Sequence, residues 1–297
     1  MIKSFELFEQ ENSIDYQKFE KYRIQTLKKR RLNNSIAILN IIILLGLGVF
    51  FMLKMRFIIS VFLLFAGVII PVLLFLRSFT YKAKFKSLIF NHIFPKIAPS
   101  YKYVVRDEEI NQIFKEIGFK YFGRAKLQDC FHGIWNGKNF KLSIIRYEIY
   151  DNSNGNINFQ GLFAFLKTTT NQYPHTVIVP NKQDAIGDKD KRKKILKKIK
   201  TNDTDFDKLF SVWTKDQNFA TKILNSQLKK FLLKLIEKYP FIGFRDNIIA
   251  LGLNDRRKAF HIRLNKPFNR ETLEQLYNDL QYYIEILEQM LLIVFAQ

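Results

Sequence analysis

Cysteine is almost absent from this chain of 297 residues, since Cys130 is the only one. No intramolecular disulfide can form, so the fold does not depend on an oxidising compartment, and a cytosolic setting for the part outside the membrane is favoured. Catalytic signatures are missing too. The sequence has no phosphate-cradling glycine loop, no HExxH pair, no paired CxxC units and no serine elbow. These absences lower the expectation of an enzyme without excluding one, and we predict no cofactor.

Acidic residues are scarce relative to basic ones. The chain holds 48 Lys and Arg against 27 Asp and Glu, which gives a formal net charge of +21. A field of that sign attracts phosphate, whether on nucleic acid or on anionic lipid, and charge alone does not choose between them. The length allows a membrane segment and one soluble domain of about 200 residues.

Charge is missing altogether from two long apolar stretches. Residues 36–53 and 57–76 are uncharged, and at 1.5 Å per residue they give helices of roughly 27 and 30 Å, close to the ~30 Å hydrocarbon core of a bilayer. Only Lys54, Met55 and Arg56 separate them. One straight helix would bury both cations mid-membrane at ~2.5–3.5 kcal/mol each, so we predict a two-helix transmembrane hairpin. The alternative, a hairpin buried in a soluble protein, would need a large protein to cover every side.

The charges that flank the hairpin predict its orientation. Cytoplasmic flanks carry the excess of Lys and Arg, so we predict that both termini are cytoplasmic, that Met55 is outside, and that the protein is a multi-pass membrane protein. The topology-setting residues are Lys28, Lys29, Arg30 and Arg31 before the first span and Arg77, Lys82, Lys84 and Lys86 after the second.

The order of patterns predicts an α+β fold: a two-helix transmembrane hairpin followed by a soluble, mixed, antiparallel-rich α+β domain. We expect a domain organisation of an N-terminal cytoplasmic helix in residues 1–35, transmembrane helices at 36–53 and 57–76, a juxtamembrane helix at 80–98 and a soluble domain at 101–297.

Local signals fill in the soluble domain. Asn136-Gly137 predicts a β-hairpin, and further strands are expected at 157–167, 176–179, 248–253 and 259–264. One apolar helical face is expected from Phe219 to Ile236. A helix capped by Asn269 should carry the stripe Leu273, Leu276, Leu280, Ile284 and Leu287, and we expect the apolar run MLLIVFA to end that helix in the core.

Cys130 and His132, beside Asp129, are the nucleophile and base nearest each other in the sequence. On a strand, residues two apart share a face, so an imidazole could activate the thiolate as a nucleophile. A buried cysteine near an ordinary histidine is the commoner arrangement. The histidines have no spacing that places two metal ligands on one helical face, so no metal site is predicted.

A basic run, KDKRKKILKKIK at residues 189–200, is the sharpest feature outside the hairpin. Ile195, Leu196 and Ile199 would cluster on one side of a helix, a composition suited to anionic lipid. A solvated basic loop is the plainer interpretation, and nucleic-acid binding is disfavoured because no stacking aromatic residues accompany the run. The lipid-surface candidates are Lys191, Arg192, Lys193, Lys194, Lys197, Lys198 and Lys200.

The chain also resembles a known family. A paired span is followed by FKSLIFNHIFPKIAPSYKY, FQGLFAFLKTTTNQYPHTVIVPN, FSVWTKDQNFATKILNSQLKKFLLKL, DNIIALGL and AFHIRL, an order similar to that of domain-of-unknown-function family 3137, over about residues 15–290. The resemblance implies a bacterial membrane hairpin ahead of a soluble domain. The family carries no assigned activity, so no site residues transfer.

Two hypotheses of function follow. The leading one is a non-enzymatic, double-span membrane anchor that presents a basic cytoplasmic domain to an unknown protein partner or to an anionic lipid surface. The alternative is a membrane-tethered enzyme that uses Cys130 and His132, and it requires the Cys130 thiol to be partly exposed in a pocket beside His132. A nucleic-acid-binding module is a weaker third reading.

Overall fold

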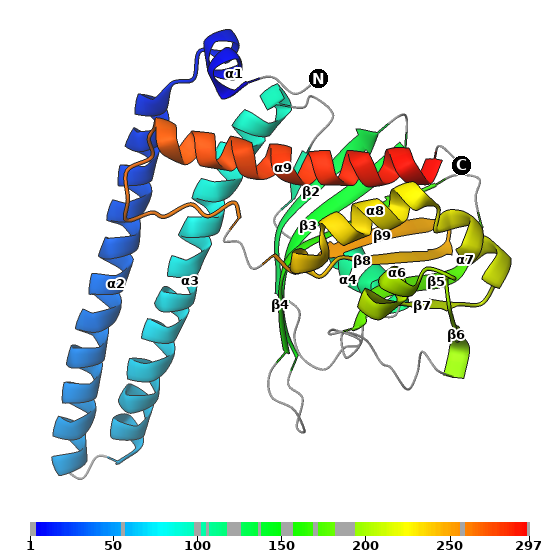
Figure 1. Cartoon of the computed structure of the whole chain (residues 1–297). Helices are drawn as coiled ribbons and strands as arrows, with labels where there is room; N and C mark the ends of the chain where they lie inside the picture. Colours follow the sequence, from blue (N-terminus) through cyan, green and yellow to red (C-terminus); the bar gives the residue numbers. More distant parts are fainter. Residues whose placement is uncertain are drawn as a thin grey trace. The chain divides into compact units, whose positions relative to one another are not determined.

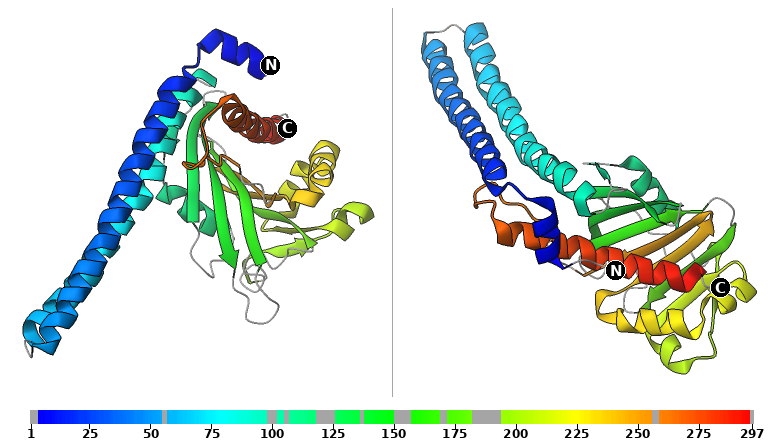
Figure 2. Two further views of the ribbon diagram at one scale, coloured as in Figure 1. Left: turned by 90° about the vertical axis from the view of Figure 1, so that its left-hand side faces the viewer. Right: turned by 90° about the horizontal axis from the view of Figure 1, so that it is seen from above.

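The computed structural model describes residues 4–54, 57–97, 102–104, 107–117, 126–135, 138–149, 157–168, 172–181, 194–255 and 259–295. The chain divides into two compact units. One, the hairpin unit, comprises Lys3–Ile93 and Ile262–Glu274. The other, the sheet unit, comprises Phe94–His261 and Gln275–Gln297. Figures 1 and 2 follow the chain from its N-terminus (blue) to its C-terminus (red).

Three helices open the chain, α1 (Phe5–Asn12), α2 (Tyr16–Leu53) and α3 (Phe57–Ile97). The long pair α2 and α3 lie side by side in Figures 1 and 2, as a hairpin. The N-terminus of α2 is capped by Asp15, whose carboxylate accepts a hydrogen bond from the backbone N–H of Lys18 at 2.9 Å.

The strands of the sheet unit are β1 (Lys102–Val104), β2 (Lys126–Trp135), β3 (Lys138–Ile149), β4 (Ile157–Lys167), β5 (Tyr173–Pro180), β6 (Lys197–Ile199), β7 (Phe210–Thr214), β8 (Phe241–Asp246) and β9 (Ile248–Leu253). Its helices are α4 (Glu108–Glu116), α6 (Thr204–Leu209), α7 (Gln217–Ile223), α8 (Ser226–Lys234), η2 (Ile236–Lys238) and the greater part of α9 (Arg270–Phe295).

The strands form one sheet. Within the described residues it has nine strands in the order β1-β2-β3-β4-β9-β8-β5-β7-β6, and each pairing is antiparallel. The predicted α+β class, with a helical hairpin ahead of an antiparallel-rich domain, is therefore confirmed. The hairpin expected at Asn136-Gly137 is confirmed in its strands, since β2 and β3 pair with Trp135 opposite Lys138.

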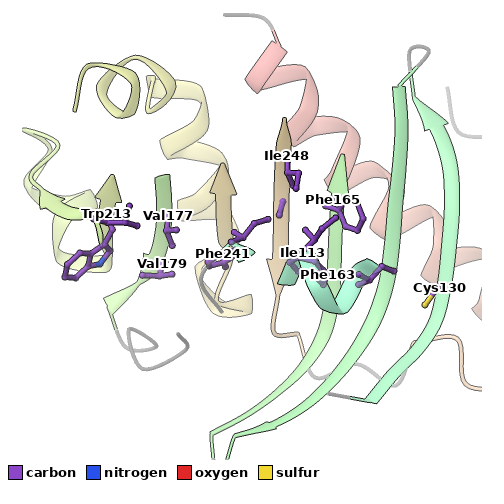
Figure 3. Packing of buried hydrophobic residues seen from close by; sticks show 13 residues of the cluster. Ile113, Cys130, Phe163, Phe165, Val177, Val179, Trp213, Phe241 and Ile248 are labelled. Atoms are coloured by element: carbon purple, nitrogen blue, oxygen red, sulfur yellow. The ribbon is translucent and has the colours of Figure 1, made fainter. Parts of the chain in front are cut away.

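One face of the sheet is covered by α4. Ile110, Ile113 and Ile117 from this helix segment are fully or almost fully buried, in one cluster with residues of six strands and with Leu196 just ahead of β6. Figure 3 shows Ile113 among the strand residues. The strand members of the cluster are Cys130, Phe163, Phe165, Val177, Val179, Trp213, Phe241, Ile248 and Ala250.

Strand residues that alternate with this cluster face the other way. Leu162, Ala164 and Leu166 of β4 are fully buried on that side, where Figures 1 and 2 show α8 and α9. The predicted stripe of α9 is confirmed, since all five of its members are buried, and the final apolar run buries Met290 and Leu291 at the end of the helix.

Two sequence expectations were wrong in detail. The apolar face from Phe219 to Ile236 is not one helix, because Asn225 interrupts it and caps α8 through a 2.8 Å bond to the backbone N–H of Leu228. Residues 259–264 do not form a strand. Phe260 has a positive φ of 54° and its N–H bonds the Asp279 carboxylate of α9 at 2.9 Å, so this segment turns instead of extending along the sheet.

Gly243 of β8 tests the packing of α4 on the sheet. A Cβ at this position would lie 2.1 Å from Cγ2 of Ile117, so Gly243→Ala should destabilise the fold by about 1–3 kcal/mol through overpacking. Removing Cγ2 as well, with Ile117→Ala, should relieve the clash. In a double-mutant cycle on thermal or chemical unfolding, the double variant should lose less stability than the two single variants added together. Strict additivity would contradict the contact.

Candidate functional site

The outer half of the hairpin is apolar on the sides that nothing covers. In the most apolar window of α2 only 11% of the residues are buried, and in that of α3 only 17%. Leu53 is 79% exposed, Ile58 88% and Phe62 76%. By length, composition and lack of cover, these parts of α2 and α3 are candidate membrane spans.

Small residues let α2 and α3 approach closely. A Cβ on Gly48 would lie 2.7 Å from Cδ2 of Leu64, and one on Gly67 would lie 3.2 Å from Cβ of Leu44. Ser60 is fully buried, and its hydroxyl donates a hydrogen bond to the carbonyl oxygen of Gly48 at 2.7 Å. Close backbones and an interhelical hydrogen bond are the usual means of pairing helices in lipid.

Both helices are longer than a bilayer is thick. At 1.5 Å per residue the 38 residues of α2 span about 57 Å and the 41 residues of α3 about 62 Å. Roughly half of each therefore lies outside a ~30 Å hydrocarbon layer. We call residues 16–35 of α2 and 80–93 of α3 the stalk.

Aromatic residues hold the stalk together. Phe19 of α2 and Phe85 of α3 are buried, and both contact the ring of Phe268, at centroid distances of 5.5 and 6.3 Å. Tyr22 stacks on Phe85 at 6.4 Å, and Phe19 meets His92 edge-on at 5.3 Å. Phe268 thus comes from far along the sequence to complete a core that two helices alone cannot close.

Phe268 belongs to a segment, residues 262–269, that we call the strap. Arg23 of α2, 7% exposed, donates a hydrogen bond to the carbonyl oxygen of Leu264, and Glu20 accepts one from the backbone N–H of Phe268 at 2.8 Å. Arg23 and Glu20 also pair with each other at 2.6 Å. The Arg23 hydrogen bond lowers the pKa of Glu20, and Glu20 raises that of Arg23. The half-buried charges are therefore satisfied by one another and by strap backbone.

Arg270, at the start of α9, holds α1 in the same unit. Its Nε lies 2.9 Å from the Glu9 carboxylate, and its guanidinium sits 5.0 Å from the ring centre of Phe5. Tyr16 donates a 2.5 Å hydrogen bond to Glu9, which, with Arg270, lowers the pKa of that carboxyl. Burial and the neighbouring carboxylate raise the pKa of Tyr16.

A groove of about 690 Å³ runs between α2 and the junction of the strap with α9. Its lining includes Tyr16, Glu20, Lys21, Ile24, Lys28 and Phe268. The sequence analysis did not anticipate this groove.

A polar network sits at the N-terminal end of α4, on the sheet unit. Asp107 accepts hydrogen bonds from Nε2 of His132 and from Lys141, both at 2.6 Å. Glu109 pairs with Lys141 at 2.5 Å and also with Lys167. Burial disfavours the charged form of Asp107, yet the hydrogen bonds from Lys141 and from the Glu109 backbone lower its pKa, and Lys141 lowers that of Glu109. The network ties α4 to β2, β3 and β4.

His132 is therefore part of a structural clamp. Pairing with Asp107 alone would raise the pKa of His132, but burial and the charge of Lys141 lower that pKa. At neutral pH the imidazole is uncharged and donates Nε2–H to Asp107. At the other end of α4, His175 donates to the carbonyl oxygen of Ile117 at 3.2 Å, and burial lowers its pKa too.

Cys130 is fully buried in the α4 cluster. The partly exposed thiol that the enzyme alternative requires is therefore not found at this position. The neighbouring Asp129 has a positive φ of 60°, at the irregularity between Gln128 and Cys130, and it accepts a hydrogen bond from Tyr103 at 3.0 Å. Within the described residues, no three His, Cys, Asp or Glu side chains gather as metal ligands would.

The described part of the basic run is helical only at residues 194–195, and residues 197–199 are edge strand β6. Leu196, just ahead of β6, and Ile199 within it are buried against the sheet, while Ile195 is 45% exposed. Pairing with β7 overrides helical periodicity here. Lys191, Arg192 and Lys193 lie outside the described residues. Lys194, Lys197, Lys198 and Lys200 are exposed, and Lys198 lies 5.8 Å from the ring centre of Trp213.

The topology-setting cations lie on the two stalk helices and at their junction with the apolar parts. Lys28, Lys29, Arg31, Lys82 and Lys84 are exposed. Arg30 and Lys86 are half-buried, and the side chain of Arg77 lies outside the described residues.

A comparison with known families finds a similarity over part of the chain. A family model described as "Protein of unknown function (DUF3137)" matches residues 157–292, from β4 into the last turns of α9. The family resemblance is confirmed over that segment. The DUF3137 match includes the strap and most of the sheet, while α1, α2 and α3 precede it.

Other comparisons add little. No curated protein sequence matches the chain. The crystal structure of the mycobacterial trehalose monomycolate transport factor A, TtfA, is similar at a TM-score of 0.37 and 7% identity, over 64% of this chain and 88% of that one. Similarity at this level supports no inference about the function of this chain.

The strap is the functional element that sequence reasoning missed. The sequence signal for it was the pair Glu20 and Arg23, charges three residues apart that lie among the aromatic residues of α2.

Because Phe268 is buried in the stalk, Phe268→Ala should loosen the strap, at a cost of about 3–5 kcal/mol for a buried phenylalanine. Hydrogen exchange of amides 264–268 should speed up sharply in the full chain, whereas Phe62→Ala, on the exposed apolar surface, should leave it unchanged. Equal protection in both variants would argue against strap docking.

The two histidines at the ends of α4 predict a pH dependence. Because their pKa values are lowered on folding, the unfolded chain takes up protons first as pH falls below about 6.5, and stability decreases until the folded pKa is reached. His132→Gln and His175→Gln should each reduce that slope, by at most about 1.4 kcal/mol per pH unit. Asp107→Asn should instead alter the slope below about pH 4. Unfolding measured from about pH 2 to 8 checks this, and an unchanged slope in both histidine variants would refute it.

Proposed function

We propose that this protein is a double-span anchor of a bacterial inner membrane that holds a basic α+β domain on the cytoplasmic side. The observation that carries the proposal is the uncovered apolar surface of the hairpin, where no more than 17% of either window is buried. A core hairpin of a soluble protein would be covered instead. The spans are 36–53 and 57–76.

The distribution of charge supports the orientation. The stalk side of the hairpin carries the cluster of Lys and Arg, and the tip carries only Lys54 and Arg56. Because Lys and Arg are retained on the cytoplasmic side, we place the stalk, the strap and the sheet unit in the cytoplasm.

An anchor without catalysis fits the described chemistry better than an enzyme does. Cys130 is buried, and His132 is engaged in the clamp on α4. The exposed lysines of the basic run, Lys194, Lys197, Lys198 and Lys200, are suited to anionic headgroups, at ~1 kcal/mol each when close to the surface. The domain is therefore held near the bilayer by its anchor and presented to lipid or to a protein partner.

Cysteine accessibility tests the orientation. In a Cys130→Ser background, Met55→Cys should react with a membrane-impermeant maleimide in intact cells from which any outer membrane has been removed. Leu7→Cys, at a position 44% exposed on α1, should react only after lysis. The reverse pattern would overturn the orientation, and release of the chain by alkaline carbonate would overturn the anchor.

A further inference from the structure

The groove on the stalk carries two positive charges that no carboxylate of the described residues neutralises. Lys21 and Lys28 line it seven residues apart on α2, both exposed, and neither pairs with a carboxylate of the described residues. Glu20 also lines the groove, but Arg23 and the N–H of Phe268 already occupy its carboxylate. The N-terminus of α9, capped by Asn269, borders the same groove and adds positive potential.

Apolar surface lies between these cations. Ile24 is 40% exposed, and it sits between Lys21 and Lys28 on the same helix. Phe268 of the strap borders the opposite wall but is only 3% exposed, so Ile24 is the apolar side chain that the groove presents. From Tyr16 to Lys28 the groove follows α2 for about 18 Å, or roughly three helical turns.

Lipid of the bilayer does not reach the part of the groove around Ile24. Twelve residues separate Ile24 from Ile36, where the first span begins, which is about 18 Å of helix. An acyl chain in the bilayer cannot cover Ile24 at that distance, so a protein segment is the occupant that the geometry favours. Its charge should be negative, to complement Lys21, Lys28 and the α9 terminus.

We propose that the groove binds an acidic amphipathic helix of a partner protein, with the apolar face of that helix on Ile24 and its carboxylates beside Lys21 and Lys28. Helices dock in grooves through apolar anchors on one face, and flanking charges select the partner. The inference rests on the proposed anchor, because the position of the membrane is what excludes lipid.

The test uses the full chain in phosphatidylcholine nanodiscs. The probe is a fluorescent helical peptide with leucines on one face and glutamates elsewhere, and binding is read by anisotropy. The acidic peptide should bind, and its analogue with lysine in place of glutamate should not. Lys21→Glu should weaken binding about fivefold, and Ile24→Asp should weaken it at least as much.

Lys18→Glu is the matched control, because Lys18 is exposed on the same helix and does not line the groove. It should leave binding unchanged. Absence of binding, equal binding of the two peptides, or equal loss in Lys18→Glu and Lys21→Glu would overturn the proposal. So would displacement of the peptide by phosphatidylglycerol nanodiscs through Lys21, which would assign the groove to lipid. All variants should stay integrated in the membrane. Loss of integration in the unmodified chain would refute the anchor instead.

Discussion

The constraint on which this structure depends is the mismatch between a ~30 Å hydrocarbon layer and helices nearly twice that length. Under the proposed anchor, lipid covers the apolar sides of α2 and α3 inside the layer. The chain then has to supply only the contact between the two helices, which Gly48 and Ser60 make possible. Outside it, two helices side by side cannot bury their facing aromatic residues from water. The strap closes that gap by placing Phe268 between Phe19 and Phe85.

When the strap packs on the stalk, its backbone N–H and C=O groups enter a partly apolar environment. These groups need hydrogen-bond partners there. Arg23 and Glu20 meet this need, because one donates to the Leu264 carbonyl and the other accepts from the Phe268 N–H. Burying the charge of Arg23 or of Glu20 alone would cost free energy, whereas as an ion pair the two charges compensate each other. The sheet unit solves a similar problem at α4, whose carboxylates are bound by Lys141 and Lys167 from neighbouring strands.

The parts that could be predicted from the sequence are those set by local pattern. The uncharged runs lie in helices, the apolar run at residues 157–167 forms β4, strands flank the Asn136-Gly137 pair, and the stripe of α9 is buried, as predicted. Local pattern failed where distant contacts decide. Residues 259–264 alternate like a strand but turn at Phe260, and residues 197–199 have helical spacing but pair with β7. The groove was out of reach because its walls are more than 240 residues apart in sequence.

The two walls of the groove come from different parts of the sequence. Phe268 and the start of α9 lie within residues 157–292, the segment that matches the family model, whereas Lys21, Ile24 and Lys28 lie on α2, ahead of it. A family resemblance over the matched segment therefore says nothing about the charge of the groove. If flanking charges select the partner, that selectivity resides in α2, and a chain with the same strap beside an acidic α2 would bind a partner of the opposite charge.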